Sequence, residues 1–216
     1  MSKRTTATVS TQQQACRASG GPTELRPGDV LGLSGACALG DAINLATWGV
    51  PRSGLSHLAI VTPYCPSVMQ APGLVVCEAT TRQDYPCAYA EKCVSGVQAH
   101  WPAEWLHHQK GRVWLYRPSR AISEQDAYAM GEWCSRMMGV PYDYWGALHA
   151  RQVVGGWLLH RFLPEDFNEF FCSEFVPAAL RWVGLFEADN CSVWSPNKFT
   201  RHWLRTGGCE RPVRIK

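Results

Sequence analysis

The sequence lacks several features that would assign a chain of this size to a particular class. It has no run of about 18 apolar residues, which excludes an ordinary membrane-spanning helix, and it shows no internal repeat. Residues 1–21 are polar and lack the apolar central stretch of a secretory signal. We therefore expect a protein made and kept in a reducing cytoplasm, unless another system exports it to a virion or to the cell envelope.

Metal-binding spacing is also missing. The ten cysteines include no Cys-x-x-Cys pair, and Cys87 and Cys93 form only a loose cluster with His100, His107 and His108. We predict no metal site and no cofactor. The cysteines are scattered through a chain too long to depend on disulfides, so most are predicted to be buried free thiols.

Excess charge of one sign occurs only at the end of the chain. The formal net charge is +3, and residues 201–216 carry five basic residues against one acidic residue, which leaves everything upstream close to neutral. A basic terminus could contact phosphates or an anionic surface, but a short solvated tail is the commoner reason for it. We predict no nucleic-acid partner.

The composition suits one compact domain. With 216 residues, 46% of them hydrophobic and 18% charged, the chain can bury a substantial core. We predict a flexible arm over residues 1–23, which are rich in Ser, Thr, Gln and Gly, then a domain over 24–205 and a basic tail over 206–216.

The first half of the chain is rich in short strand-like segments. Apolar runs bounded by Gly and Pro predict strands over 29–33, 56–61, 74–79 and 113–117, which would form an antiparallel sheet. A short helix is predicted over 41–49, with Asp41 as its cap.

The pattern becomes helical after Ser123. Apolar residues recur at three- and four-residue steps from Ala127 to Met137, and Gly139 and Pro141 stop the helix. Two more helices are predicted at about 143–159 and 173–183. A strand-rich half followed by a helix-rich half predicts an α+β domain, with the sheet packed against helices.

Cys172 lies in the segment Phe-Phe-Cys-Ser-Glu-Phe-Val-Pro at 170–177. Pro177 cannot lie deep inside a helix, so the helix should begin near Ser173 and place Cys172 at its N-terminus. Unpaired backbone N–H groups and the helix dipole stabilise a thiolate there, and the same groups could hold the oxyanion of an acyl transfer. A buried structural thiol is the alternative.

His57 heads an otherwise apolar strand. Alternation along the strand sends His57, Ala59 and Val61 to one side, and Leu58 and Ile60 to the other. A cysteine hydrolase needs an imidazole on a rigid element, to take the thiol proton and later to protonate the leaving group. A structural histidine is the alternative.

Glu78 lies in a hydrophobic strand, where a carboxylate is costly unless it is paired or near the rim of the sheet. It could orient the imidazole and stabilise its charged form, which is the third role in a catalytic triad. An exposed edge glutamate is the alternative.

The remaining histidines have no partner spacing of this kind. We predict surface or packing roles for all six, namely His100, His107, His108, His149, His160 and His202. The ten tryptophans are many for this length. Trp101, Trp105 and Trp145 could line a substrate groove, although core packing is the ordinary explanation.

Five short segments, taken in order, resemble the permuted NlpC/P60 hydrolases of the YiiX and YaeF type. These are relatives of papain-like amidases and of the lecithin-retinol acyltransferase group. The segments are Pro-Gly-Asp at 27–29, Ser-His-Leu-Ala-Ile-Val at 56–61, Val-Val-Cys-Glu-Ala at 75–79, Tyr-Asp-Tyr at 142–144 and Cys-Ser-Glu-Phe-Val at 172–176. Histidine before cysteine is the order of the permuted branch, whereas ordinary members place the cysteine first.

The resemblance implies a circularly permuted papain-like fold over about 25–203. It also implies a thiol hydrolase with Cys172 as nucleophile, His57 as base and Glu78 as the polar third member. The stretch 146–168 and Pro177 depart from the family pattern, and they leave the shape of the groove open.

The same resemblance implies a bacterial or phage enzyme that cleaves a peptide or isopeptide bond through a thioester. Peptidoglycan stem peptides are the first candidate substrate, with Tyr144, Ser56 and Ser173 as substrate-binding residues. Acyl transfer to or from a lipid is the alternative enzyme activity. A non-catalytic binding or virion-structural module on the same fold is the alternative from another class.

Overall fold

The computed structural model of the protein describes residues 24–34, 54–65, 73–143, 170 and 172–216. The statements that follow concern these residues. The predicted arm over 1–23, the predicted helix over 41–49 and nearly all of the one over 143–159 lie outside them, as do Tyr144 and Trp145. The predicted division of the chain into arm, domain and tail stays a prediction.

Antiparallel strands form one six-stranded sheet in the order β4-β3-β2-β1-β5-β6. Its members are β1 (Val30–Ser34), β2 (His57–Pro63), β3 (Leu74–Thr80), β4 (Gly96–His100), β5 (Arg112–Tyr116) and β6 (Val213–Arg214). The first three and β5 agree with the predicted strands to within two residues at each end. Strands β4 and β6 were not predicted.

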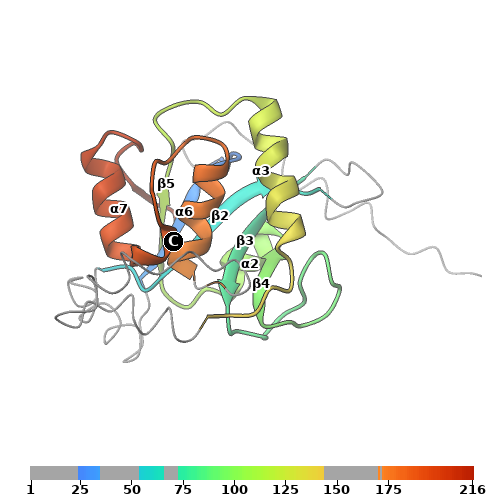
Figure 1. The fold of residues 1–216 in the computed structure, drawn as a ribbon. Helices are drawn as coiled ribbons and strands as arrows, with labels where there is room; N and C mark the ends of the chain where they lie inside the picture. Colours follow the sequence, from blue (N-terminus) through green and yellow to red (C-terminus); the bar gives the residue numbers. More distant parts are fainter. Residues whose placement is uncertain (1–23, 35–53, 66–72, 144–169, 171) are drawn as a thin grey trace, which may run out of the picture.

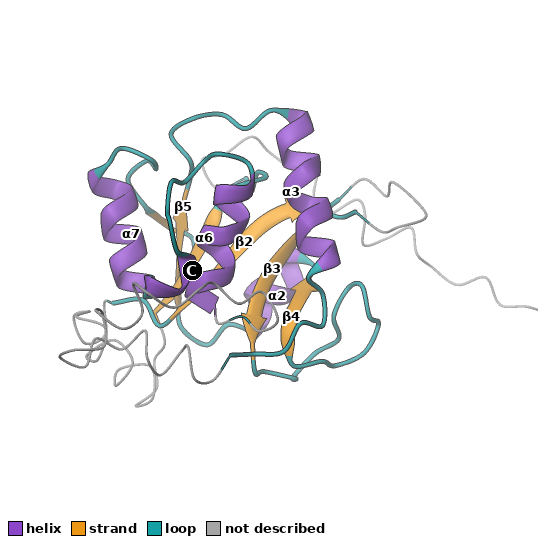
Figure 2. Ribbon diagram, viewed as in Figure 1, coloured by secondary structure: helices purple, strands orange, loops and turns teal. Residues whose placement is uncertain are grey.

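The described helices cover both faces of this sheet. They are α2 (Pro102–His108), α3 (Glu124–Arg136), α6 (Cys172–Trp182) and α7 (Pro196–Arg205), with a short 3-10 turn η2 (Cys191–Val193) before α7. Figure 1 shows α3, α6 and α7 in front of the sheet and α2 behind it. The same view by element type shows the layers of helix and sheet, which confirm the predicted α+β class (Figure 2).

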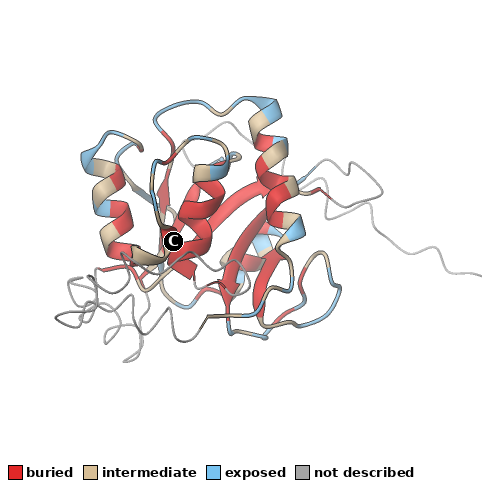
Figure 3. Cartoon of the chain, in the orientation of Figure 1, coloured by how far each residue is buried: buried red, intermediate tan, exposed pale blue. Residues whose placement is uncertain are grey.

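Strand alternation divides the core between the two faces. Leu58 and Ile60 of β2 belong to the larger cluster, which also contains the buried side chains of α3, α6 and α7. Ala59 and Val61 belong to the smaller cluster, with Trp105 of α2. The predicted alternation in β2 is therefore confirmed, and Figure 3 shows the strands buried and the outer sides of the helices exposed.

Helix α3 follows the predicted pattern. The Ser123 side chain accepts a hydrogen bond from the Asp126 backbone N–H at 3.1 Å, which caps the helix. Met130, Trp133 and Cys134 are buried on the face that meets the sheet.

Helix α6 begins at Cys172, one residue before the predicted start. The expectation that Pro177 stays out of the helix interior is wrong, because Pro177 is the sixth residue of α6 and is buried. A proline has no N–H, so the helical bond to the Ser173 carbonyl cannot form, yet the helix continues through it. Gly184, with φ of +64°, follows the helix as predicted, and Leu185 N–H donates to the Leu180 carbonyl.

The last part of the chain is built into the fold. Helix α7 starts at the Ser195–Pro196 cap and buries Phe199 and Trp203. Strand β6 adds to the sheet edge by pairing with β5.

All eight described cysteines are free thiols. Seven of them are buried, as predicted for most of the cysteines, and Cys93 is exposed. No helix within the described ranges is long and apolar enough to cross a membrane.

Candidate active site

His57 and Glu78 meet at the end of the sheet. Ile60 pairs with Cys77, which places Glu78 beside Ala59 and diagonal to His57 on the neighbouring strand. The His57 Nε2 atom lies 2.5 Å from Glu78 Oε2. The His57 side chain is 16% exposed and that of Glu78 only 3%, so the pair sits at the boundary between core and solvent. His57 is therefore the partner that the buried Glu78 carboxylate requires.

Cys172 completes this arrangement from a different element. Helix α6 packs on β2 and β3, and its first residue is Cys172, which is 7% exposed. Cys172 lies near enough to the His57 ring to raise its pKa, as Glu78 does from the other side. Because Nε2 faces Glu78, Nδ1 is the ring nitrogen left for the thiol. Side chains that are 115 residues apart in the sequence thus meet at one imidazole.

The electrostatics of the site favour a charged imidazole. Burial lowers the pKa of His57, but the charges of Cys172 and Glu78 and the hydrogen bonds to both raise it to about 10. Burial raises the pKa of the Glu78 carboxyl, but His57 and His100 outweigh this effect and lower it. At neutral pH the expected state of this pair is a His57 imidazolium beside the Glu78 carboxylate.

The predicted substrate-binding residues are placed differently from one another. Ser56 immediately precedes His57, and its hydroxyl donates to the Leu33 carbonyl at 3.2 Å. Ser173 is the second residue of α6 and is buried. Tyr144 lies outside the described residues. Of the tryptophans proposed for a groove, Trp105 is fully buried in the core, whereas Trp101 is 40% exposed and packs on Tyr64.

His100 was missed by the sequence interpretation, which gave it no partner. It ends β4, is 1% exposed, and its Nε2 atom lies 3.9 Å from Glu78 Oε1. Glu78 therefore lies between two imidazoles, His57 on one side and His100 on the other. Strand alternation from Val97 and Ala99, which are buried on the other face, was the signal that could have placed His100 on the face of Glu78.

A second buried carboxylate, Glu174, supports the start of α6. It is the third residue of the helix and is 3% exposed, and it accepts a hydrogen bond from the Ser192 hydroxyl in η2. An anion in the first turn of a helix is stabilised by the helix dipole. The bond ties η2 to the turn that carries Cys172.

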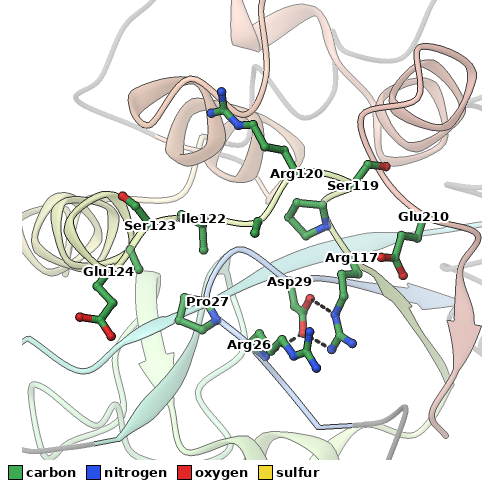
Figure 4. Close-up of a pocket in the computed structure, with 13 residues that line it drawn as sticks. Arg26, Pro27, Asp29, Arg117, Ser119, Arg120, Ile122, Ser123, Glu124 and Glu210 are labelled. Carbon is green, nitrogen blue, oxygen red and sulfur yellow. Dashed lines mark hydrogen bonds and ion pairs between the residues drawn. The ribbon is translucent and has the colours of Figure 1, made fainter.

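The Pro-Gly-Asp segment at 27–29 lies at a different part of the structure from Cys172 and His57. Asp29 is fully buried and pairs with Arg117, whose Nε and Nη2 atoms lie 3.0 Å from its two carboxylate oxygens. Both residues line a cavity of about 380 Å³, with Arg26, Arg120 and Glu210 among its other lining residues (Figure 4). Neither Cys172 nor His57 lines that cavity.

Comparison with known proteins adds a structural similarity. No protein-family model and no curated protein sequence matches the chain. Five chains of solved structures are similar to it. One is the crystal structure of the metalloprotein yiiX from Escherichia coli O157:H7, with 18% sequence identity, 88% of each chain covered and a TM-score of 0.48. In the described part of this chain, no group of three or more His, Cys, Asp or Glu residues is arranged to hold a metal ion.

Proposed function

We propose that the protein is a cysteine hydrolase on a permuted papain-like NlpC/P60 fold, with Cys172 as nucleophile, His57 as acid and base, and Glu78 as the group that orients His57. One observation carries the proposal: His57 is bonded to a buried carboxylate and lies beside a cysteine at a helix N-terminus that raises its pKa. This combination supports the proposal, because a catalytic triad requires a nucleophile, a base and a group that orients the base.

Acylation starts from the thiolate–imidazolium pair. The Cys172 sulfur attacks the carbonyl carbon of an amide, and a tetrahedral intermediate forms. In this proposal, backbone N–H groups in the first turn of α6 hold its oxyanion. The carbon–nitrogen bond then breaks, the His57 imidazolium gives its proton to the departing amine, and a thioester on Cys172 remains.

Deacylation returns the site to its first state. Neutral His57 takes a proton from water, and the resulting hydroxide attacks the thioester carbonyl. The carbon–sulfur bond breaks, the carboxylic acid product leaves, and His57 is again an imidazolium beside the Cys172 thiolate. Glu78 keeps the ring oriented through both steps, because its hydrogen bond is to the nitrogen that does not face the sulfur.

The substrate class that we propose is a peptide or isopeptide bond, with peptidoglycan stem peptides as the first candidate. Lipid amides are the second class to be tested. This choice comes from the resemblance of the five sequence segments, and the contacts of the site are compatible with any amide carbonyl that can reach Cys172. Ser173 contributes its backbone N–H in this proposal, since its side chain is buried.

Competition between two cysteines tests the nucleophile. Cys93 is exposed and Cys172 is buried, so access alone makes Cys93 react first with iodoacetamide. If His57 activates Cys172, limiting reagent at pH 7 should alkylate Cys172 about tenfold faster than Cys93, as read by peptide mass spectrometry. Faster labelling of Cys93 would falsify the activated thiolate and favour a binding module on the same fold.

Turnover needs a separate measurement. Purified peptidoglycan fragments and a set of lipid amides would be incubated with the wild type, with Cys172→Ala and, as matched control, with Cys93→Ala. We expect products with the wild type and with Cys93→Ala, and none with Cys172→Ala. If the wild type changes neither pool, the hydrolase assignment fails even if Cys172 is reactive.

A further inference from the structure

His100 is a buried histidine with an acceptor on each side of its ring. Its Nδ1 atom lies 3.0 Å from the Pro86 carbonyl oxygen, and its Nε2 atom lies 3.0 Å from Gln98 Oε1. A backbone carbonyl oxygen can only accept, so Nδ1 must carry a proton. The state of Nε2 depends on which end of the Gln98 amide faces it.

The other end of Gln98 decides its orientation. Gln98 Nε2 lies 2.9 Å from the Arg82 carbonyl oxygen and 3.5 Å from that of Thr80. Turning the amide over would direct its oxygen at these two acceptors, so the NH₂ group must face them. Oε1 then faces His100, and Nε2 of the ring must also be a donor.

Three hydrogen bonds thus connect the Pro86 carbonyl, His100, Gln98 and the Arg82 carbonyl. Each of them has a donor only if both ring nitrogens of His100 carry a proton. A neutral ring would direct a lone pair at one of two oxygens that are 3.0 Å away. Such a charge in the core requires a counter-charge. Glu78 Oε1, 3.9 Å from His100 Nε2 and almost fully buried, supplies it.

Other charged and titratable groups also surround the ring. Tyr85 from the turn after β3 packs on it, with ring centroids 4.0 Å apart. Glu104 of α2 favours its charged form and Arg82 opposes it. Burial is the largest influence and leaves the pKa of His100 lowered, although Glu78 and the Pro86 carbonyl raise it. The two acceptor oxygens at 3.0 Å from the ring nitrogens oppose burial, and the charged ring is inferred from them.

We propose that His100 is held as an imidazolium and acts as a positioning residue, which fixes Glu78 as a carboxylate facing His57. This inference rests on the proposed function. It extends the site to a row of alternating charge: the thiolate of Cys172, the imidazolium of His57, the carboxylate of Glu78 and the imidazolium of His100. His100 lies behind Glu78 and touches no reacting atom.

The protonation state can be measured on the wild-type full chain. Long-range ¹H–¹⁵N correlation spectra of the imidazole nitrogens separate protonated from unprotonated ring nitrogens. At pH 7.5 both nitrogens of His100 should be protonated, and the signals of exposed His107 on α2 serve as the internal comparison. A His100 ring with one unprotonated nitrogen at pH 7.5 overturns the proposal.

Variants then test whether the charge matters for the site. His100→Gln should slow alkylation of Cys172 by iodoacetamide by roughly tenfold at pH 7 and change the pH profile of that rate. His107→Gln should leave both unchanged. Gln98→Leu removes one acceptor, so one His100 nitrogen should lose its proton in the spectrum. A His100→Gln protein that is less stable but has an unaltered pH profile would show only a packing role.

The readouts also separate this inference from the proposed function. If Cys172 reacts more slowly than Cys93 in the wild type, the hydrolase proposal fails, whatever the spectrum of His100 shows. If Cys172 is fast and His100 is neutral, only the present inference fails.

Discussion

Glu78 and Asp29 are both buried carboxylates near strand ends, but they have opposite kinds of partner. Asp29 faces the fork of Arg117, and its Oδ2 atom also accepts from the Arg26 backbone N–H at 2.8 Å. Glu78 faces two imidazoles, His57 at 2.5 Å and His100 at 3.9 Å. A guanidinium keeps its protons at every physiological pH, whereas an imidazole can gain or lose one.

This difference separates a pair that only holds the fold together from a pair that can take part in a reaction. The Asp29–Arg117 pair joins the start of β1 to the end of β5, and its partner cannot exchange protons during a reaction. The Glu78–His57 pair holds a ring that can. The partner of a buried carboxylate is thus more informative about function than its burial, which is nearly the same at the two positions.

The largest expected effect is at Glu78. Glu78→Gln keeps the size of the side chain and removes the charge that stabilises the His57 imidazolium, so we expect a loss of about 10³-fold in hydrolysis and in Cys172 alkylation at pH 7. The rates are measured by product release and by timed labelling. Asp29→Asn is the matched control, and an equal loss of reactivity in that variant would erase the distinction between the two carboxylates.

The next effect is on stability. Asp29→Asn replaces one of the two carboxylate oxygens that accept from Arg117 with an NH₂ group, which cannot accept, and should lower the free energy of unfolding by about 2 kcal/mol. Urea denaturation followed by tryptophan fluorescence measures it. The alkylation rate of Cys172 should stay within about twofold of the wild type, because nothing at the His57 ring changes.

As the pH falls, the contributions of Glu78 and Asp29 to the free energy of unfolding should change in opposite directions. The folded pKa of Glu78 is lowered from 4.5, because His57 outweighs burial, so its contribution to stability is lost as the pH falls through that folded value. The folded pKa of Asp29 is raised from 3.8 by burial, against Arg117, so the fold favours its protonated form. The effect on stability is about 1.4 kcal/mol for each unit of pKa shift.

Unfolding curves between pH 6 and pH 3.5 test this. The stability advantage of the wild type over Glu78→Gln should shrink as the pH falls, and its advantage over Asp29→Asn should grow. Parallel pH dependences for the two variants would contradict the assigned directions.

A third buried carboxylate, Glu174, extends the comparison and gives the smallest expected effect on stability. Glu174 accepts from the Ser192 hydroxyl, a neutral partner that does not titrate near pH 7. Ser192→Ala should cost about 1 kcal/mol of stability and loosen η2 from α6, whereas Ser192→Thr keeps the donor. Thermal unfolding compares the two, and equal melting temperatures would show that the bond adds nothing.

Much of this architecture could be predicted from local signals. Short apolar runs bounded by Gly and Pro placed β1, β2, β3 and β5, and strand alternation put His57 on the correct face of β2. The position of Pro177 predicted a helix start near Ser173, one residue after the observed start at Cys172, although that proline lies further inside the helix than local rules allow.

The missing parts depend on contacts between distant segments. Strand β4 is short and includes Gly96, whose φ of +99° and closeness to the Val140 carbonyl exclude a side chain, since an added Cβ would lie 2.1 Å from that oxygen. Its Gln98 and His100 look like surface residues until Arg82 and Pro86 supply acceptors. A single sequence gives no measure of such partners, and His100 was therefore missed.

The position of Glu78 between two rings has a consequence for the whole reaction cycle. In the proposed mechanism, acylation removes the negative charge of the sulfur and the proton of the neighbouring ring together, while the carboxylate and the second ring remain paired. The interior then has the same net charge before and after each chemical step. The buried groups around the site cannot reorient as water does. They therefore never have to stabilise an unpaired ion, either before or after acylation.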